Sequence, residues 1–268
     1  IKCASLISNL LVFFLGDKSK IIKRSNINYC INLREGIDLG IFLGINNEAS
    51  ILNIDQIMNI NKKQTIIDIG ANIGSVSLPL AKTFKNSTII SIEPTVYAFS
   101  KLKKNVNLNP YLKKRIILQN IFISNKEKIT REVYSSWNFL DSGKKHNIHL
   151  GILKKTSLKT KKLDQICSKL ENIDLIKIDV DGHELDVLKS GKTTIMKHKP
   201  FIYFEFAPYL YREFGYTPEN LINYIKKDLD YLFFDENLKR VFNIENFVKK
   251  LQDRSQNFFL FHKSIKVK

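Results

Sequence analysis

The chain has 268 residues, of which 44% are hydrophobic and 26% charged. This balance is typical of a globular protein and excludes a disordered one. The formal net charge of +17 raises the question of an anionic partner, such as nucleic acid, an anionic glycan or a membrane surface. The lysines are scattered and no arginine-rich arm is present, so we expect a compositional bias rather than a nucleic-acid site, while contact with a membrane surface stays open.

Three cysteines, at positions 3, 30 and 167, lie far apart and show no Cys-x-x-Cys or Cys/His spacing. This disfavours a zinc site and a disulfide framework and suits a reducing compartment, so we expect a cytoplasmic protein. The apolar run at residues 4–15 is shorter than the roughly 20 residues of a membrane-spanning helix. We expect a helix packed on the domain, with the remnant of a signal or anchor as the alternative.

Residues 1–60 lack a regular alternation of strands and helices, and we interpret them as an N-terminal extension or cap. Within them, residues 29–33 and 40–43 predict short strands, and residues 49–59 predict a helix by the spacing of their apolar side chains. From residue 65 onward the alternation is regular. We expect strands at 66–69, 88–92, 116–123, 174–179 and 200–206, with helices at 76–85, 97–108, 163–170 and 185–196.

The C-terminal part continues with a helix that Thr217 caps, with Pro218 at its first position, and then with strands at 231–234 and 257–261. Strands separated by helices of this length indicate right-handed crossovers, so the sequence predicts an α/β fold with a mostly parallel sheet and an antiparallel last edge. We assign residues 61–265 to this domain. Residues 125–162 interrupt it with a polar, basic insert that holds the single tryptophan, Trp137, and we interpret the insert as a lid.

The first strand of this domain leads into a glycine turn, Asp68-Ile-Gly70-Ala-Asn72-Ile-Gly74. Its glycine spacing differs from the dinucleotide fingerprint, and it lacks the Gly-Lys-Ser/Thr of a phosphate-binding loop. An acid ahead of the glycines suits a cationic group such as an ammonium. Glu93 ends the next strand, where an acid can accept hydrogen bonds from two ribose hydroxyls. A nucleoside that carries an amino acid satisfies both features, and S-adenosylmethionine is the leading candidate.

Four stretches, in this order and spacing, resemble the FkbM-type methyltransferases: residues 68–74, 91–94, 175–191 and 199–205. The most specific is Lys-Ile-Asp-Val-Asp-Gly-His-Glu at 177–184, although the family more often has Glu where this chain has Asp181. The resemblance spans residues 30–262. It implies a Rossmann-like class I methyltransferase fold with a seven-stranded sheet and helices on both faces. It also implies S-adenosylmethionine as methyl donor and O-methylation of a sugar or natural-product hydroxyl.

On that fold, the resemblance assigns a cofactor role to residues at the first three strand ends. Gly70 and Gly74 make room for the methionine moiety, with Asn72 between them in the turn. Asp68 favours the ammonium group and Glu93 holds the ribose. We expect residues 120–125 to border the adenine, and we select Asn120 among them as the candidate contact.

The stretch at 177–184 is the predicted catalytic edge. Methyl transfer depends on alignment of donor and acceptor, and a hydroxyl acceptor also has to lose a proton. We predict that Asp179 orients the acceptor, that His183 is a candidate base, and that Lys177 pairs with Asp179 or lines the site. The alternative for His183 is a solvent-facing position in the first turn of a helix.

Other acids nearby have simpler interpretations. Asp181 and Glu184 also suit the first turn of a helix, where the helix dipole favours negative charge. Glu205 together with Asp179 is the one pair to consider for a divalent cation, but we expect no metal.

Two alternatives to a small-molecule enzyme stay open. One is a non-catalytic module that binds an anionic partner through the basic surface and residues 125–162, although intact Gly70, Gly74 and Glu93 weigh against it. The other is an RNA methyltransferase, motivated by the net charge of +17. We expect a small-molecule or glycan acceptor, and the sequence makes no prediction of oligomeric state.

Overall fold

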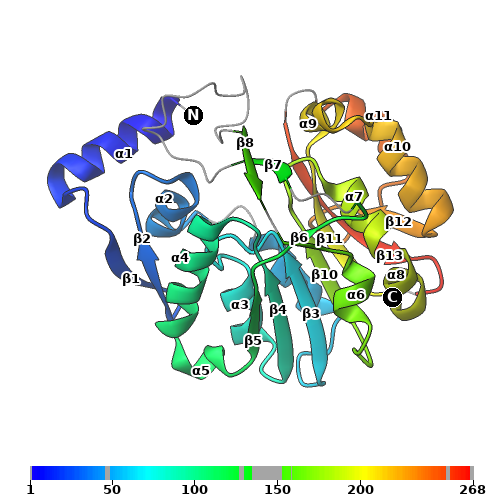
Figure 1. Cartoon of the computed structure of the whole chain (residues 1–268), viewed down its shortest axis with the longest axis horizontal. Coiled ribbons are helices and arrows are strands. Elements are labelled where there is room, and N and C mark those ends of the chain that lie inside the picture. The colour runs from blue at the N-terminus through cyan, green and yellow to red at the C-terminus, as the bar shows by residue number, and fades with distance from the viewer. Residues whose placement is uncertain are drawn as a thin grey trace.

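A seven-stranded sheet forms the centre of the molecule, with the strand order β12-β13-β11-β10-β3-β4-β5 (Figure 1). The computed structural model describes residues 2–45, 49–126, 130–134, 153–157, 159–251 and 254–265. The strands of the sheet are β3 (Gln64–Ile69), β4 (Ser87–Ile92), β5 (Ile116–Gln119), β10 (Leu175–Ile178), β11 (Phe201–Phe206), β12 (Tyr231–Phe234) and β13 (Gln256–His262).

The sheet is mostly parallel, which confirms the predicted fold class. Each neighbouring pair from β11 through β10, β3 and β4 to β5 is parallel. Strand β13 is antiparallel to both of its neighbours, β11 and β12. The predicted antiparallel strand is therefore present, but it lies one place in from the edge, and the edge strand itself is β12.

Helices cover both faces of the sheet because successive strand residues point to opposite sides. Ile66 of β3 packs in one hydrophobic cluster with Leu80, and the next residue, Ile67, packs in another with Leu188. Both isoleucines are fully buried, as expected for a strand covered on two faces. The helices of the domain are α3 (Ser77–Thr83), α4 (Val96–Asn107), α5 (Pro110–Lys113), α6 (Leu163–Cys167), α7 (Glu184–Ser190), α8 (Lys192–His198), α9 (Pro208–Tyr211), α10 (Pro218–Asn223) and α11 (Ile244–Lys249).

Two helix predictions can be compared directly with the structure. The cap at Thr217 is confirmed, because its side chain accepts a hydrogen bond from the Asn220 N–H. The single helix expected at 185–196 is instead two, α7 and α8, which meet at Gly191. Gly191 lies close against Leu163, since a Cβ atom at position 191 would lie 2.5 Å from the Leu163 Cδ2 atom.

The N-terminal residues form a helix, a hairpin and two more helical segments beside the sheet. Their bounds are α1 (Lys2–Leu15), β1 (Lys20–Arg24), β2 (Ile27–Ile31), α2 (Gly36–Leu43) and a 3₁₀ helix at Ala49–Gln56. The strand expected at 40–43 is wrong: these residues end α2, whose first turn is anchored by Asp38 through hydrogen bonds from the Asn32 N–H and from Lys101. No helix in the described ranges is long and apolar enough to cross a membrane.

The insert predicted at 125–162 starts and ends at one short parallel strand pair. Strand β6 (Phe122–Ile123) pairs with β9 (Thr160–Lys161), so the two ends of the insert are held together. Strands β7 (Thr130–Tyr134) and β8 (Leu153–Ser157) form an antiparallel hairpin inside it. Trp137 lies outside the described residues.

A buried asparagine of α4 joins the N-terminal hairpin to the glycine turn. The Asn105 Oδ1 atom accepts a hydrogen bond from the Cys30 N–H at 2.7 Å, and its Nδ2 atom donates to the Ile73 carbonyl at 2.9 Å. Asn105 is completely buried, so the two backbone groups depend on its side chain rather than on water for these hydrogen bonds. The N-terminal segment and the turn after β3 are therefore held by one side chain.

We expect Asn105→Ala to destabilise the protein by about 2–4 kcal/mol, because it leaves a buried N–H and a buried C=O without their partner. Chemical denaturation monitored by circular dichroism measures this. Asn107→Ala on the same helix is the matched control, since Asn107 is exposed. Equal stability of the two variants would contradict the bridging role of Asn105.

Candidate functional site

The glycine turn after β3 has an unusual backbone conformation. Gly70, Asn72 and Gly74 have φ values of 79°, 46° and 91°, in the left-handed region that glycine adopts most easily. The N–H groups of Gly70 and Ala71 both donate to the carbonyl of Ile92, at 2.9 and 3.0 Å. The turn is thereby tied to the end of β4.

The structure gives each glycine of the turn a specific neighbour. A Cβ atom at Gly70 would lie 1.7 Å from the carbonyl oxygen of Asp179, which directly follows β10. One at Gly74 would lie 3.0 Å from the Leu102 side chain on α4. Glycine at these positions therefore lets the turn approach the end of β10 and pack against α4.

Glu93 follows β4 and lies directly against the turn. Its carboxylate accepts hydrogen bonds from the Asn72 N–H at 3.0 Å, from the Thr95 N–H at 2.9 Å and from the Thr95 hydroxyl at 2.6 Å. Glu93 is buried, and burial raises its pKa while these hydrogen bonds oppose the rise. The Asn120 side chain donates to the carbonyls of Glu93 and Pro94, so it braces the segment that carries the carboxylate.

Lys177 joins the turn to the acidic end of β10. Its side chain is 2% exposed, and its Nζ atom donates to the Gly70 carbonyl at 2.9 Å. The same Nζ atom lies 3.5 Å from Asp68 Oδ1 and 3.4 Å from Asp179 Oδ2. Asp68 is fully buried and its other oxygen accepts from the Ser77 hydroxyl at 2.5 Å. The two predicted site acids thus share one buried cation.

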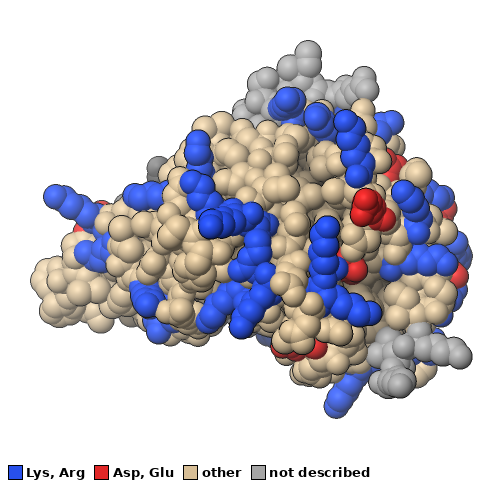
Figure 2. Space-filling view, turned by 90° about the horizontal axis from the view of Figure 1, so that it is seen from below, with Lys and Arg blue, Asp and Glu red and all other residues tan. Residues whose placement is uncertain are grey.

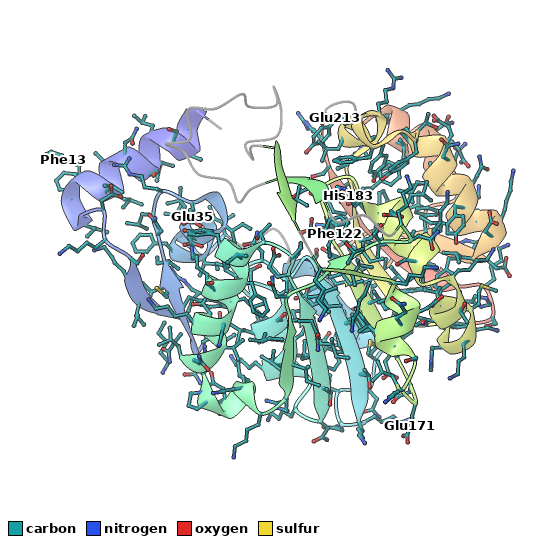
Figure 3. All side chains as sticks on the ribbon, viewed as in Figure 1. Phe13, Glu35, Phe122, Glu171, His183 and Glu213 are labelled. Carbon is teal, nitrogen blue, oxygen red and sulfur yellow. The ribbon has the colours of Figure 1, made fainter. Side chains whose placement is uncertain are left out.

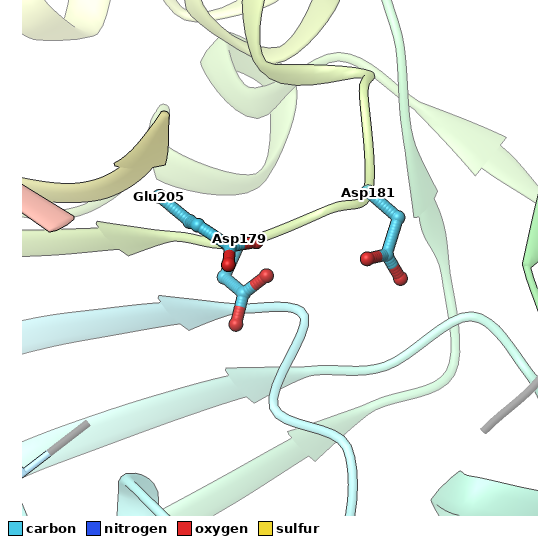
Figure 4. Close-up of side chains that lie close together, drawn as sticks. All are labelled: Asp179, Asp181 and Glu205. Atoms are coloured by element: carbon cyan, nitrogen blue, oxygen red, sulfur yellow. The ribbon is translucent and has the colours of Figure 1, made fainter. Parts of the chain in front are cut away.

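Three carboxylates gather where β10 and β11 end (Figure 4). Asp179, Asp181 and Glu205 each offer an oxygen, and these oxygens all lie within 4.8 Å of one another. Burial raises the pKa of Glu205 well above its ordinary value, and the negative charges of Asp179 and Asp181 raise it further. Such a cluster can take up a proton, and its oxygens are of the kind that bind a divalent cation.

Glu184, close to this cluster, accepts hydrogen bonds from the backbone of its own loop. Its Oε1 atom accepts from the N–H groups of Val180 and Gly182 at 3.3 and 3.2 Å, and its Oε2 atom lies 3.3 Å from the Tyr216 hydroxyl. Burial, aided by the charges of Asp179 and Asp181, raises the pKa of Glu184 to about 8. The Tyr216 hydroxyl donates its hydrogen to the Gly182 carbonyl at 2.9 Å. A protonated Glu184 can therefore donate a hydrogen bond to the Tyr216 oxygen.

His183 lies at the start of α7 and contacts two aromatic rings, of which Figure 3 labels Phe122. Its ring centroid is 5.1 Å from that of Phe122 and 4.2 Å from that of Phe214. Its Nδ1 atom is 3.3 Å from the Val180 carbonyl. His183 is only partly exposed, so it differs from the solvent-facing residue considered as an alternative, and it is not one of the three clustered acids.

A second buried charge cluster was not predicted. Lys101 of α4 contacts Glu35 at 2.9 Å and also Asp38, and both acids come from the N-terminal segment. Tyr97, one turn before Lys101, donates to Glu35. Burial raises the pKa of Asp38 to about 6, although the Lys101 charge opposes this. No spacing rule connects these residues, because Lys101 is 66 residues from Glu35 and 63 residues from Asp38 in the chain.

The sheet and its strand ends define a Rossmann-like fold of the class I methyltransferases. A family model described as "Methyltransferase FkbM domain" matches residues 68–233, so the chain belongs to the FkbM methyltransferase family. The chain is similar to the 2-O-methyltransferase NoeI of Sinorhizobium fredii, with 29% identity over 184 residues, 61% of this chain and 73% of NoeI. It is also similar to the methyltransferase sdnD of Sordaria araneosa, with 26% identity over 161 residues, 50% of this chain and 62% of sdnD.

Among solved structures, the chain is similar to a methyltransferase FkbM from Methylobacillus flagellatus KT. The identity is 19%, the TM-score is 0.49, and the match covers 77% of this chain and 45% of that one. The chain therefore spans less than two thirds of the length of this solved protein, and also less than two thirds of the length of sdnD.

Glu184→Gln is expected to flatten the pH dependence of stability between about pH 4.5 and 8. In this range the unfolded chain loses the Glu184 proton while the folded protein keeps it, because its folded pKa is about 8. Wild-type stability should therefore fall with rising pH more steeply than that of the variant, by up to about 1.4 kcal/mol per pH unit. Urea denaturation at a series of pH values measures both slopes.

The control is Glu171→Gln, at an exposed position at the opposite end of the sheet (Figure 3). It should keep the wild-type slope. Identical slopes for Glu184→Gln and the wild type would show that Glu184 is ionised in the folded protein.

Proposed function

We propose that this protein is an S-adenosylmethionine-dependent O-methyltransferase. The observation that carries the proposal is the placement of Glu93. Its buried carboxylate is fixed by the Asn72 and Thr95 N–H groups, at the end of β4 and directly against the glycine turn. A fixed carboxylate at this point of an open α/β sheet is suited to two neighbouring ribose hydroxyls.

The residues around Glu93 fit an amino-acid-bearing nucleoside. The Asn72 Oδ1 atom is buried and receives no hydrogen bond from any described residue, so it can accept one from a ligand. The turn between Gly70 and Gly74 would accommodate the methionine moiety. The carboxylate of Asp68, which is paired with Lys177, would favour its ammonium group. Asn120, which holds the backbone of Glu93, would border the adenine.

S-adenosylmethionine supplies a methyl group on a sulfonium, and the acceptor oxygen takes the place of the sulfur. The task of the protein is to align the acceptor and to take its proton. We assign both roles to Asp179, whose backbone contacts the glycine turn and whose carboxylate is partly exposed. Lys177 keeps Asp179 in place. His183, held between Phe122 and Phe214, would border the acceptor as the second candidate base.

The acceptor in this proposal is a hydroxyl of a sugar or another small natural product. The similarity to NoeI, a 2-O-methyltransferase, supports an oxygen acceptor. Residues 1–60, as a cap, and the insert at 125–162 would shape the acceptor side, while residues 61–265 carry the catalytic fold. The three free cysteines fit a reducing cytoplasm as the place of action.

Glu93→Gln is expected to weaken binding of S-adenosylhomocysteine by about 10- to 100-fold, because a charged acceptor of hydroxyl hydrogen bonds is worth more than a neutral one. Isothermal titration calorimetry of the purified chain measures the affinity. Glu171→Gln should bind like the wild type. A wild-type protein with no measurable affinity, or a Glu93→Gln variant with unchanged affinity, would contradict the assigned cofactor site.

Asp179→Asn is expected to lower the rate of methyl transfer by about 100-fold or more, since a lost general base typically costs this much. Transfer of a labelled methyl group from S-adenosylmethionine to a panel of monosaccharides and oligosaccharides measures it. Affinity for S-adenosylhomocysteine should change far less than the rate. A variant that keeps the wild-type rate on every accepted sugar would remove Asp179 from the mechanism.

A further inference from the structure

Helix α1 has its small residues inward and most of its large apolar residues outward. Ser8 is completely buried and its hydroxyl donates to the Leu33 carbonyl at 2.8 Å, and Ala4 and Val12 lie on the same inner side. Six large apolar side chains of the helix are exposed: Leu6, Ile7, Leu10, Phe13, Phe14 and Leu15. Figure 3 shows Phe13 on the outer side of α1, away from the sheet.

This orientation is the reverse of what burial of apolar surface would produce in an isolated protein. Phe13, Phe14 and Leu6 are 80%, 72% and 71% exposed, although each would gain from removal from water. Their spacing along the helix places Leu6, Leu10 and Phe13 on one side. A contiguous apolar face of this kind marks an interaction surface.

Positive charge predominates in the segment that follows this apolar face. The first 34 residues contain six Lys and Arg but a single acid, Asp17. Asp17 pairs with Arg34 at 3.2 Å, so little negative charge is left in this part of the surface. Lys18 and Lys23 are exposed in the segment that follows α1, and Ile21 between them is 62% exposed.

We infer that α1 and the segment after it bind the surface of an anionic lipid bilayer. Leu10, Phe13 and their exposed neighbours would enter the boundary between headgroups and acyl chains, and Lys18 and Lys23 would contact the anionic headgroups. Charge decides between this occupant and a second copy of the chain. A second copy carries the same net charge of +17 and the same basic segment, so two copies repel each other, whereas an anionic bilayer attracts both.

The basic character is not confined to the segment after α1. The face of the molecule seen in Figure 2 has many Lys and Arg side chains and few acidic ones, and basic side chains flank the uncharged surface at its left edge, where α1 and β1 lie. On this face, a bilayer that binds α1 therefore meets mostly basic and uncharged side chains at its border. The inference is independent of the proposed methyl transfer, because it uses none of the residues at the strand ends.

The test is co-sedimentation of the 268-residue chain with vesicles of two compositions. Phosphatidylcholine vesicles that contain about a third phosphatidylserine should bind the protein, and pure phosphatidylcholine vesicles should bind it far more weakly. Phe13→Gln together with Leu10→Gln should reduce partitioning by about 10-fold or more, since two large apolar side chains no longer leave water. Lys18→Gln together with Lys23→Gln should reduce it by about 25-fold, which is about 5-fold for each lysine removed.

Phe242→Gln is the matched control for the apolar substitutions. Phe242 is 79% exposed, as much as Phe13, but it lies outside α1. Glutamine is a good helix former, and both substituted α1 positions are exposed, so circular dichroism should show an unchanged fold.

Three results would overturn the inference. The first is equal binding of the wild type and the Phe13/Leu10 variant to anionic vesicles. The second is an equal loss of binding in the Phe242→Gln control. The third is a concentration-dependent dimer in gel filtration that the α1 substitutions break, without any vesicle binding, because a second copy of the chain would then cover the helix.

Discussion

The buried ammonium group of Lys177 is the interaction on which the arrangement of the strand ends depends. It lies between Asp68 and Asp179 and donates to the carbonyl of Gly70. Two carboxylates at the ends of adjacent parallel strands repel each other unless a cation lies between them. Because Gly70 has no Cβ atom, the backbone after β10 can approach the turn closely enough for one lysine to reach all three groups. Replacing this lysine with an uncharged residue would leave buried charges unpaired, which commonly costs several kcal/mol.

The polar groups of the site are held by backbone and side-chain contacts from distant parts of the chain. Glu93 is fixed by the turn after β3, and the loop after β10 is fixed by Glu184 and Tyr216. The N-terminal segment is attached by Asn105, which also holds the glycine turn. A site built in this way is pre-organised, so a ligand does not have to order it on binding. The glycine turn and Glu93 lie at the ends of β3 and β4, and the acid cluster lies at the ends of β10 and β11, as a consequence of strand order.

Much of the fold could be predicted because isoleucine-rich runs such as β3 and β4 are typical of strands buried on two faces. Boundaries that depend on tertiary contacts could not. Residues 40–43 have the apolar character of a strand but form the end of a helix that Asp38 anchors through Asn32 and Lys101. The strand expected at 116–123 is divided in two: β5 ends at Gln119 in the large sheet, and residues 122–123 form β6, which pairs with β9 at the other end of the insert.

The positions of the candidate site residues followed from the rule that ligands bind at the carboxyl ends of parallel strands. Their individual contacts did not follow from it. Asn120 braces Glu93, and Glu184 binds the backbone of its own loop, because their partners are set by the folded geometry. Tyr216 is 32 residues from Glu184 in the chain, and no spacing rule connects them. Sequence spacing predicts which residues meet within a strand–turn–helix unit, but not which side chain from another unit completes their hydrogen bonds.

A crystal structure with S-adenosylhomocysteine would test the central claim most directly, namely that Glu93 and Asp179 face one nucleoside site organised by Lys177. We expect both ribose hydroxyls within hydrogen-bonding distance of Glu93 and the sulfur atom directed toward Asp179 and Glu205, with Lys177 still bound to the Gly70 carbonyl. A nucleoside bound elsewhere, or a sulfur atom directed away from the ends of β10 and β11, would contradict the account.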